Sequence, residues 1–195
     1  MPNLPISQLP SASALTGAEI FPLVQGGITK QTTFTALASG SYEANSYYGS
    51  FYHTASMFIT TPSALYSMSF STTDFASGVS VANPDKSYFT FANPGVYDLQ
   101  FSVQITKTSG TKSNVYIWLR QNGIDVPNTN TDITLAGGSG DRVVAAWNFF
   151  IKTTTANETA QLMYSGTVGN VELLYATSSI GPNIPSVIAT INRVG

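Results

Sequence analysis

Residues 96–107 read VYDLQFSVQITK, and this stretch decides the fold class. Its apolar side chains all fall on one face of an extended chain, and these are Tyr97, Leu99, Phe101, Val103 and Ile105. Polar side chains occupy every position between them. Because side chains alternate between the two faces of a β-strand, this period of two predicts a strand with one buried face and one solvent-facing face.

Similar runs follow one another along the rest of the chain, at 51–59, 64–71, 87–91, 115–121, 143–152, 160–165, 171–177 and 184–193. Turn signals such as Asn93-Pro94-Gly95 and Asn122-Gly123 separate them. No amphipathic helical pattern of useful length occurs. Many short strands at this spacing predict an all-β protein, built as a sandwich or jelly roll.

One run, VVAAWNFFI at 143–151, is apolar on both faces. A strand of a two-layer sandwich normally has one polar face, so the second face needs a cover. We expect another subunit to cover Val144, Ala146 and Phe150; a loop such as 137–141 is the alternative. Tyr116 and Trp118, which share one face of the 115–121 run, are the further candidates for a subunit interface.

The first forty residues form a separate pattern. Residues 19–24 and 28–34 read as two strands, and Gly26-Gly27 between them suits a tight hairpin turn. Pro22 favours an edge position, and 35–38 fit a helical turn. An isolated hairpin is marginal in water, so its apolar residues need a neighbouring surface. The candidate anchoring residues are Ile6, Leu9, Ile20, Phe21, Leu23, Val24, Ile28 and Phe34.

This pattern divides the chain into an anchoring segment (1–40), a linker rich in Ser, Gly and Tyr (41–48) and a β domain (49–195). No stretch is apolar for long enough to span a bilayer. The start MPNLPISQLP lacks the basic and apolar regions of a secretory signal, which predicts a chain made without a cleaved leader.

Charge is scarce. Charged residues make up 9% of the chain, against about 25% in ordinary soluble domains. Eight Lys and Arg residues lie scattered singly, without the basic stripe that nucleic-acid binding needs. The uncharged polar surface that remains suits an assembled particle exposed to varied salt and pH. With no cysteine, the domain has no disulfide, so packing or oligomerisation must stabilise it.

Four stretches of the β domain resemble the trimeric jelly roll of the complement globular head and the tumour necrosis factor family. They are YFTFANPGVYDLQFSVQI (88–105), VYIWLRQNGIDVP (115–127), RVVAAWNFFIK (142–152) and IPSVIATINRV (184–194). The resemblance spans about 49–195 and implies a ten-stranded sandwich that assembles as a compact homotrimer. Such a homotrimer would cover the two-sided strand.

The opening stretch ISQLPSASALTGAEIFPLVQGGITKQTT (6–33) resembles the N-terminal module of bacteriophage tail-fibre and other virion fibre proteins. In those proteins the N-terminal part anchors to the particle and the C-terminal part projects. The long shaft of that family is missing here, which favours a short knob or spike.

The sequence gives little support for a catalytic site. His53 is the one histidine, so any Ser-His-Asp arrangement must use it, and its strand-like context favours a structural role. Asp125 and Asp132 are candidates for paired carboxylates, and with the oxygens of Asn128 and Asn130 for a calcium site, but their spacing is that of an ordinary polar loop. We expect no catalytic residue, no metal site and no cofactor. Aromatic residues eligible to stack on sugars are Tyr66, Tyr88, Tyr116, Trp118 and Tyr175.

The sequence therefore predicts a non-enzymatic virion protein, made in the host cytoplasm. It is expected to bind itself as a homotrimer and other virion proteins through residues 1–40. Tail-borne attachment to a host-surface glycan or protein is the first expectation, and capsid decoration is the alternative. A free trimeric binding module is the alternative of another class. Neither nucleic acid nor membrane insertion is expected.

Overall fold

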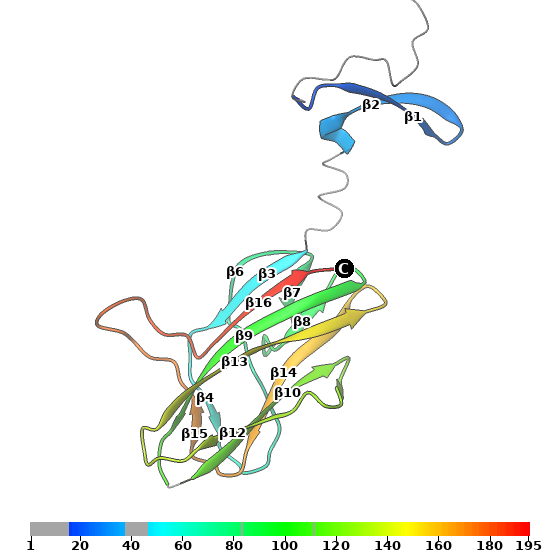
Figure 1. Ribbon diagram of the computed structural model, residues 1–195. Helices are drawn as coiled ribbons and strands as arrows, with labels where there is room; N and C mark the ends of the chain where they lie inside the picture. The colour runs from blue at the N-terminus through cyan, green and yellow to red at the C-terminus, as the bar shows by residue number, and fades with distance from the viewer. Residues whose placement is uncertain (1–15, 38–46, 83, 111) are drawn as a thin grey trace, which may run out of the picture. The chain divides into compact units, whose positions relative to one another are not determined.

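The computed structural model describes residues 16–37, 47–82, 84–110 and 112–195. The chain divides into two compact units, Met1–Asn45 and Ser46–Gly195, and each is described by itself. Both are built of strands, and the described helical residues are a single turn at 34–37. The prediction of an all-β jelly-roll sandwich preceded by a hairpin is confirmed (Figure 1).

The N-terminal unit is a two-stranded hairpin. β1 (Ile20–Gln25) pairs antiparallel with β2 (Ile28–Thr33), and Gly26 and Gly27 form the turn with φ of 62° and 76°. Both angles lie in the left-handed region that glycine adopts without steric cost. The predicted strand–turn–strand and the helical turn after it are both present, although Ile6, Leu9 and Ala38 lie outside the described residues.

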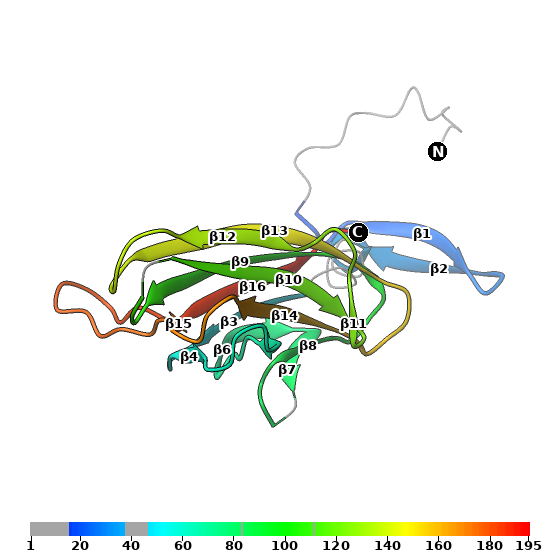
Figure 2. The same cartoon turned by 90° about the horizontal axis from the view of Figure 1, so that it is seen from below.

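The larger unit has two seven-stranded sheets packed face to face (Figure 2). The first, called the β9 sheet here, has the order β4 (Met57–Ile59), β15 (Val171–Leu173), β9 (Gly95–Lys107), β16 (Val187–Arg193), β3 (Tyr48–His53), β6 (Thr72–Ser77), with β13 (Arg142–Thr153) pairing β9. Residues 97–103 of β9 pair with β16 as well as with β13. Because a strand has only two flanks, β13 lies opposite β16 and forms an edge of the sheet.

The second sheet, called the β10 sheet, has the order β11 (Ile124–Asp125), β10 (Ser113–Gln121), β14 (Glu158–Gly166), β8 (Tyr88–Phe91), β7 (Val79–Ala82). β12 (Thr131–Leu135) pairs β10 and β5 (Tyr66–Ser67) pairs β14. Asn122 and Gly123, with φ of 49° and 80°, make the predicted tight turn from β10 to β11.

The core lies between the inner faces of the two sheets. The alternation predicted for 96–107 is confirmed, because Tyr97, Leu99 and Val103 are fully buried and Phe101 and Ile105 nearly so. Val115, Ile117 and Leu119 of β10 and Ala160, Leu162 and Tyr164 of β14 pack against them. This burial of apolar area is the main stabilising contribution to the domain.

Some predicted runs are wrong in extent. The run 51–59 is two strands, β3 and β4, because β3 pairs β16 while β4 pairs β15. The run 64–71 contains only the two-residue strand β5. Strands β6, β7, β11 and β12 correspond to none of the predicted runs. Five of the six side chains of β6 are exposed, so its sequence carries no alternation of buried and polar residues.

Candidate interaction surfaces

β13 leaves three of the predicted interface residues uncovered. Val144 is 56% and Phe150 is 66% exposed, and Ala146 between them is exposed as well. On the other side of the strand Ala145 and Ile151 are buried in the core. The loop 137–141 does not cover this face of β13, because Val144, Ala146 and Phe150 remain exposed to solvent. Among the described residues, nothing packs over this face of β13.

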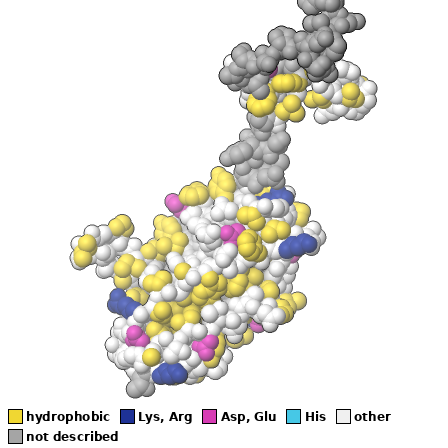
Figure 3. All heavy atoms as spheres, viewed as in Figure 1, with side chains coloured by type: hydrophobic (Ala, Val, Ile, Leu, Met, Phe, Trp, Pro, Cys, Tyr) yellow, Lys and Arg dark blue, Asp and Glu magenta, His cyan; other side chains and the backbone are white. Residues whose placement is uncertain are grey.

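The register of the β9 sheet extends this surface across four strands. Ala146, Ser102, Ile188 and Tyr52 form one row from β13 through β9 and β16 to β3. The neighbouring rows are Asn148, Gln100, Thr190, Ser50 and then Phe150, Asp98, Asn192, Tyr48. These twelve residues are called the outer face here. Figure 3 shows hydrophobic side chains gathered on the side of the domain that the ribbon of Figure 1 presents.

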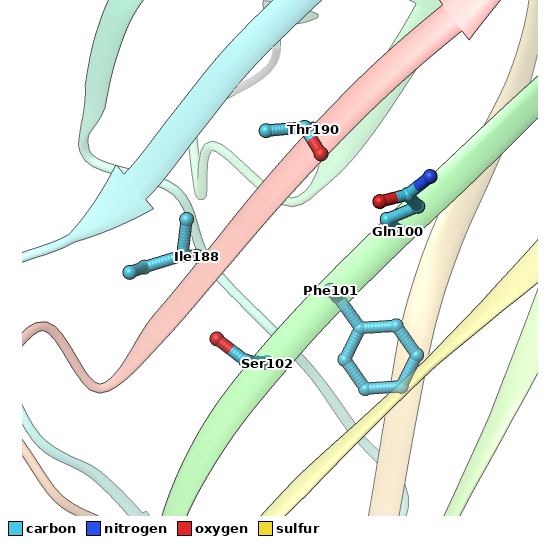
Figure 4. A pocket seen from close by; sticks show the side chains of 5 residues that line it. All are labelled: Gln100, Phe101, Ser102, Ile188 and Thr190. Carbon is cyan, nitrogen blue, oxygen red and sulfur yellow. The ribbon is translucent and has the colours of Figure 1, made fainter.

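The outer face is hollowed at its middle. Gln100, Ser102, Ile188 and Thr190 surround a hollow of about 220 Å³, with Phe101 beneath (Figure 4). The charged residue of the three rows, Asp98, accepts hydrogen bonds from Asn148 Nδ2 and Gln100 Nε2, each at 2.8 Å. Neutral amides therefore solvate this carboxylate, which lowers the cost of burying it under a partner.

In the residues that the structure describes, the edge of the sheet at β13 has partly exposed aromatic residues and unpaired hydrogen-bonding groups. Trp147 and Phe149 are only half-buried; with Phe101 they make an aromatic cluster with ring centroids 4.7–6.2 Å apart. The Trp147 indole Nε1 is buried without a hydrogen-bond partner among the described residues. An unsatisfied buried donor costs about 1–3 kcal/mol. Within the described part of the chain, β13 has no second paired strand, so its outer edge is open to pairing or packing.

Tyr116 and Trp118 lie on the opposite sheet. Both point away from the core on β10, where Tyr116 is half-buried and Trp118 is 8% exposed. Trp118 Nε1 donates to Asp125 Oδ1 at 2.8 Å, and Arg120 Nε donates to the same oxygen at 2.7 Å. These hydrogen bonds lower the pKa of the Asp125 carboxyl. The five predicted interface residues thus form two groups on two different sheets.

The hairpin exposes most of its predicted anchoring residues. Val24 is 71%, Ile28 is 64% and Ile20 is 63% exposed, and Phe21 and Phe34 are exposed in smaller part. Leu23 is half-buried. Because Val24 and Ile28 fall on opposite faces in the register of β1 and β2, residues 16–37, the described part of this unit, leave apolar side chains exposed on both faces of the hairpin.

The base of the hairpin is fixed by one carboxylate. Glu19 accepts hydrogen bonds from Thr16 N at 2.7 Å, from Thr16 Oγ1 at 2.8 Å and from Gly17 N at 2.8 Å. These bonds to the ionised form lower the pKa of Glu19 to about 2. Thr35 closes the turn from the other side, through hydrogen bonds of its N (3.1 Å) and Oγ1 (2.7 Å) to Gly17 O. A motif of Thr16, Gly17, Glu19 and Thr35 therefore holds the base in place.

The catalytic and metal candidates do not converge. His53 Nδ1 accepts a hydrogen bond from the backbone of Ser71 at 3.2 Å, and burial lowers the pKa of His53. Asp132 is bound by Asn114 Nδ2, while Asp125 is bound by Trp118 and Arg120. Their register partners on β10, Tyr116 and Arg120, are four residues apart, which is about 13 Å along a strand.

The described residues contain no group of three or more His, Cys, Asp or Glu that could hold a metal ion. They also contain no helix with the length and apolar character that a membrane span requires.

Three surface features were not identified in the sequence. Ile188 of the outer face could have been recognised, because it is the apolar residue at the outward positions 188, 190 and 192 of the last strand. The half-buried state of Trp147 and Phe149 gives no local signal, because it depends on contacts with residues far away in the chain, such as Phe101. The hollows beside Trp118, described below, depend on a loop fold that the sequence does not reveal.

No family model matches the chain, and no curated protein matches it. Solved structures do match it in fold. The globular domain of zebrafish complement 1qA protein is 9% identical, with a TM-score of 0.46, covering 76% of this chain and 98% of its own. Murine APRIL at pH 8.0 is 6% identical, with a TM-score of 0.48, covering 75% and 98%. Eiger TNF from S. frugiperda is 9% identical, with a TM-score of 0.48, covering 77% and 94%. At these identities the comparison adds nothing about function, and the fold assignment rests on the strand pairing itself.

Proposed function

We propose that this chain is a non-enzymatic structural protein of a bacteriophage virion, a short homotrimeric fibre or knob. Residues 1–40 dock it on the particle, and the jelly-roll unit Ser46–Gly195, called the head domain or simply the head, attaches to the host surface. The observation that carries the proposal is that both units leave apolar surface uncovered: the outer face and edge of the head, and both faces of the hairpin. Exposed apolar surface of this extent marks an interaction site.

Self-association follows from the two incomplete surfaces of the head. The outer face and the β13 edge differ in shape and chemistry, since one is hollowed and the other presents Trp147 and Phe149. Two different surfaces on one chain can satisfy each other in a closed ring of copies. A trimer is the ring that the sequence resemblance implies. In that ring a neighbouring copy covers Phe150 and the exposed parts of Trp147 and Phe149.

Docking on a larger particle accounts for the hairpin. A hairpin this short cannot stabilise itself by burial, and its local turn motif leaves Ile20, Val24 and Ile28 in solvent. A free secreted binding module, the alternative of another class, would have no use for such a surface. The exposed hairpin therefore favours a virion component, made in the host cytoplasm and carried on the particle.

The oligomeric state is tested on the full-length protein by size-exclusion chromatography with light scattering. A mass near three chains at micromolar concentration is expected. A monomer at that concentration would refute the trimer.

Docking is tested by deleting residues 1–45. The truncated protein should remain a folded trimer and should be absent from particles purified after complementation. Incorporation of the truncated protein at the wild-type level would contradict the docking role.

Attachment and capsid decoration are separated by immunogold labelling of intact particles. Gold at the virion tail supports attachment, whereas gold confined to the capsid supports decoration. Particles that lack the protein should adsorb to host cells more slowly if attachment is its role.

A further inference from the structure

The outward surface of the β10 sheet has two hollows side by side. One, of about 310 Å³, is lined by Ser63, Tyr116, Trp118, Asn130, Ser165, Gly166 and Thr167. The other, of about 290 Å³, is lined by Trp118, Asp125, Val126, Pro127, Asn128 and Asn130. Trp118 and Asn130 belong to both, so the two hollows form one groove with an indole in its shared wall.

The walls of this groove are fixed before any ligand arrives. Asp125 holds Trp118 and Arg120 through one carboxylate oxygen. The loop after β11 is braced by Thr129, whose Oγ1 donates to Val126 O at 2.7 Å and accepts from Leu119 N at 3.2 Å. Val126 N in turn donates to Leu119 O at 2.9 Å. Such pre-organisation lowers the entropic cost of binding.

Polar groups around the groove lack partners. The side chains of Asn128 and Asn130 are exposed, and neither makes a hydrogen bond to the described residues. The hydroxyl of the half-buried Tyr116 also makes no hydrogen bond within the described part of the chain. These groups offer amide and hydroxyl donors and acceptors beside aromatic rings. The charged side chain of the lining, Asp125, is already paired with Arg120, so the groove favours a neutral ligand.

We infer that this groove binds a neutral saccharide, with one sugar ring in each hollow. A sugar ring combines an apolar C–H surface, which packs against aromatic rings, with hydroxyls that pair with amides. A volume of about 300 Å³ is at the small end for ligand sites and suits one ring. This inference names the ligand for the attachment function proposed above and rests on it. The groove also lies on the sheet opposite the outer face, so the proposed trimer contact through that face leaves it open.

Another hollow is larger but fits a saccharide less well. It measures about 380 Å³ and is lined by Tyr52, Thr54, Tyr175, Pro182, Asn183, Pro185 and Ile188. Tyr52 and Ile188 belong to the outer face, which the proposed trimer covers. The amide of Asn183 is already engaged, because its Nδ2 donates to the Tyr175 hydroxyl at 3.0 Å.

The test uses full-length protein and a panel of neutral disaccharides: maltose, cellobiose, lactose, melibiose and N,N′-diacetylchitobiose. Saturation-transfer NMR identifies binders, and calorimetry measures their affinity. At least one disaccharide should bind with a Kd in the millimolar range or tighter. Asn130→Ala should weaken binding about 3- to 10-fold, the value of one lost hydrogen bond.

Two further variants make the test specific. Asn128→Gly removes the second amide while tolerating the φ of 62° at that position, and it should also weaken binding. Asn183→Ala, in the other hollow, is the matched control and should bind as the wild type does. Unchanged mass and melting temperature establish that each variant is folded.

The inference is overturned if no disaccharide of the panel binds, if Asn130→Ala binds normally, or if Asn183→Ala instead loses binding. Adsorption assays keep the two proposals apart. Loss of the saccharide inference with protein-dependent adsorption intact leaves the attachment function standing. Saccharide binding by the pure protein, together with normal adsorption of particles that lack it, removes the attachment function alone.

Discussion

The hairpin and the head are both β-structure with few charges, yet different forces hold them. In the head, Phe51, Phe89, Leu99 and Ile117 are fully buried, and the fold depends on apolar area removed from water. In the hairpin the larger apolar residues stay mostly exposed, and a carboxylate, a glycine and a backbone ladder define the shape. The hairpin shows that local hydrogen bonds and turn residues can specify a shape whose apolar side chains stay exposed.

The largest expected effect is in the core of the head. Phe89 is fully buried, with its ring centroid 4.7 Å from that of Phe70 and 5.5 Å from that of Phe51. Phe89→Ala should lower the free energy of unfolding by about 3–5 kcal/mol, measured by urea denaturation. The matched change in the hairpin, Val24→Ala, should alter it by less than about 0.5 kcal/mol. Equal effects would mean that the hairpin is part of the core.

The next effect concerns the outer face. Phe150→Asp places a charge in the proposed trimer contact and should cost about 2 kcal/mol or more per interface, which light scattering would detect as dissociation. Ile124→Asp is the control, since Ile124 is 73% exposed on the other sheet, and it should leave the trimer intact. Dissociation by both variants would indicate a general loss of stability instead.

A smaller effect is expected at the base of the hairpin. Gly17 has φ of 93°, and a Cβ there would collide with Thr35 Oγ1. Gly17→Ala should destabilise the hairpin by about 1–3 kcal/mol. Amide chemical shifts of β1 and β2 would report this change, while the melting temperature of the head stays constant. Native hairpin shifts in this variant would refute the turn motif.

The smallest expected effect is the pH dependence of the stability of the hairpin, which arises from Glu19 at its base. Because the folded pKa of Glu19 is about 2, below the unfolded value near 4.5, its ionised form stabilises the hairpin above the unfolded pKa. That contribution is lost as pH falls through the folded pKa. An NMR titration of the Glu19 carboxyl should have its midpoint near 2, and Glu19→Gln should abolish the acid transition of the hairpin. A midpoint near 4.5 would contradict the hydrogen bonds.

The head also contains a turn in which a glutamate carboxylate accepts hydrogen bonds from backbone N–H groups. Glu158 Oε1 accepts from Thr154 N at 2.6 Å and Thr155 N at 2.8 Å, and Oε2 accepts from Asn122 Nδ2 at 2.8 Å. These bonds lower the pKa of Glu158 still further than that of Glu19. The added amide from Asn122 ties the turn to the β10–β11 hairpin, so in the head this motif joins distant segments.

Local sequence predicted the elements whose cause is local. The alternation in 96–107 predicted β9, and Gly26-Gly27 predicted the turn of the first hairpin. The two apolar faces of 143–151 indicated that β13 has an apolar face outside the core. It could not separate β3 from β4, because the break depends on which distant strand each one joins. It also could not predict that Trp118 is held by Asp125, since the loop that returns Asp125 to β10 creates that contact.

By itself the sequence determined that this protein is built of strands and that residues 20–33 form a small hairpin. These properties follow from side-chain periodicity and turn chemistry, which act over a few residues. Only the tertiary structure decided that β13 is an edge strand, and that Val144 and Trp118 lie on opposite sheets. The positions of the hollows were also decided only there. The edge position of β13, the two sheets and the hollows all arise from hydrogen-bond register between segments far apart in the chain, and this register depends on how the whole core packs.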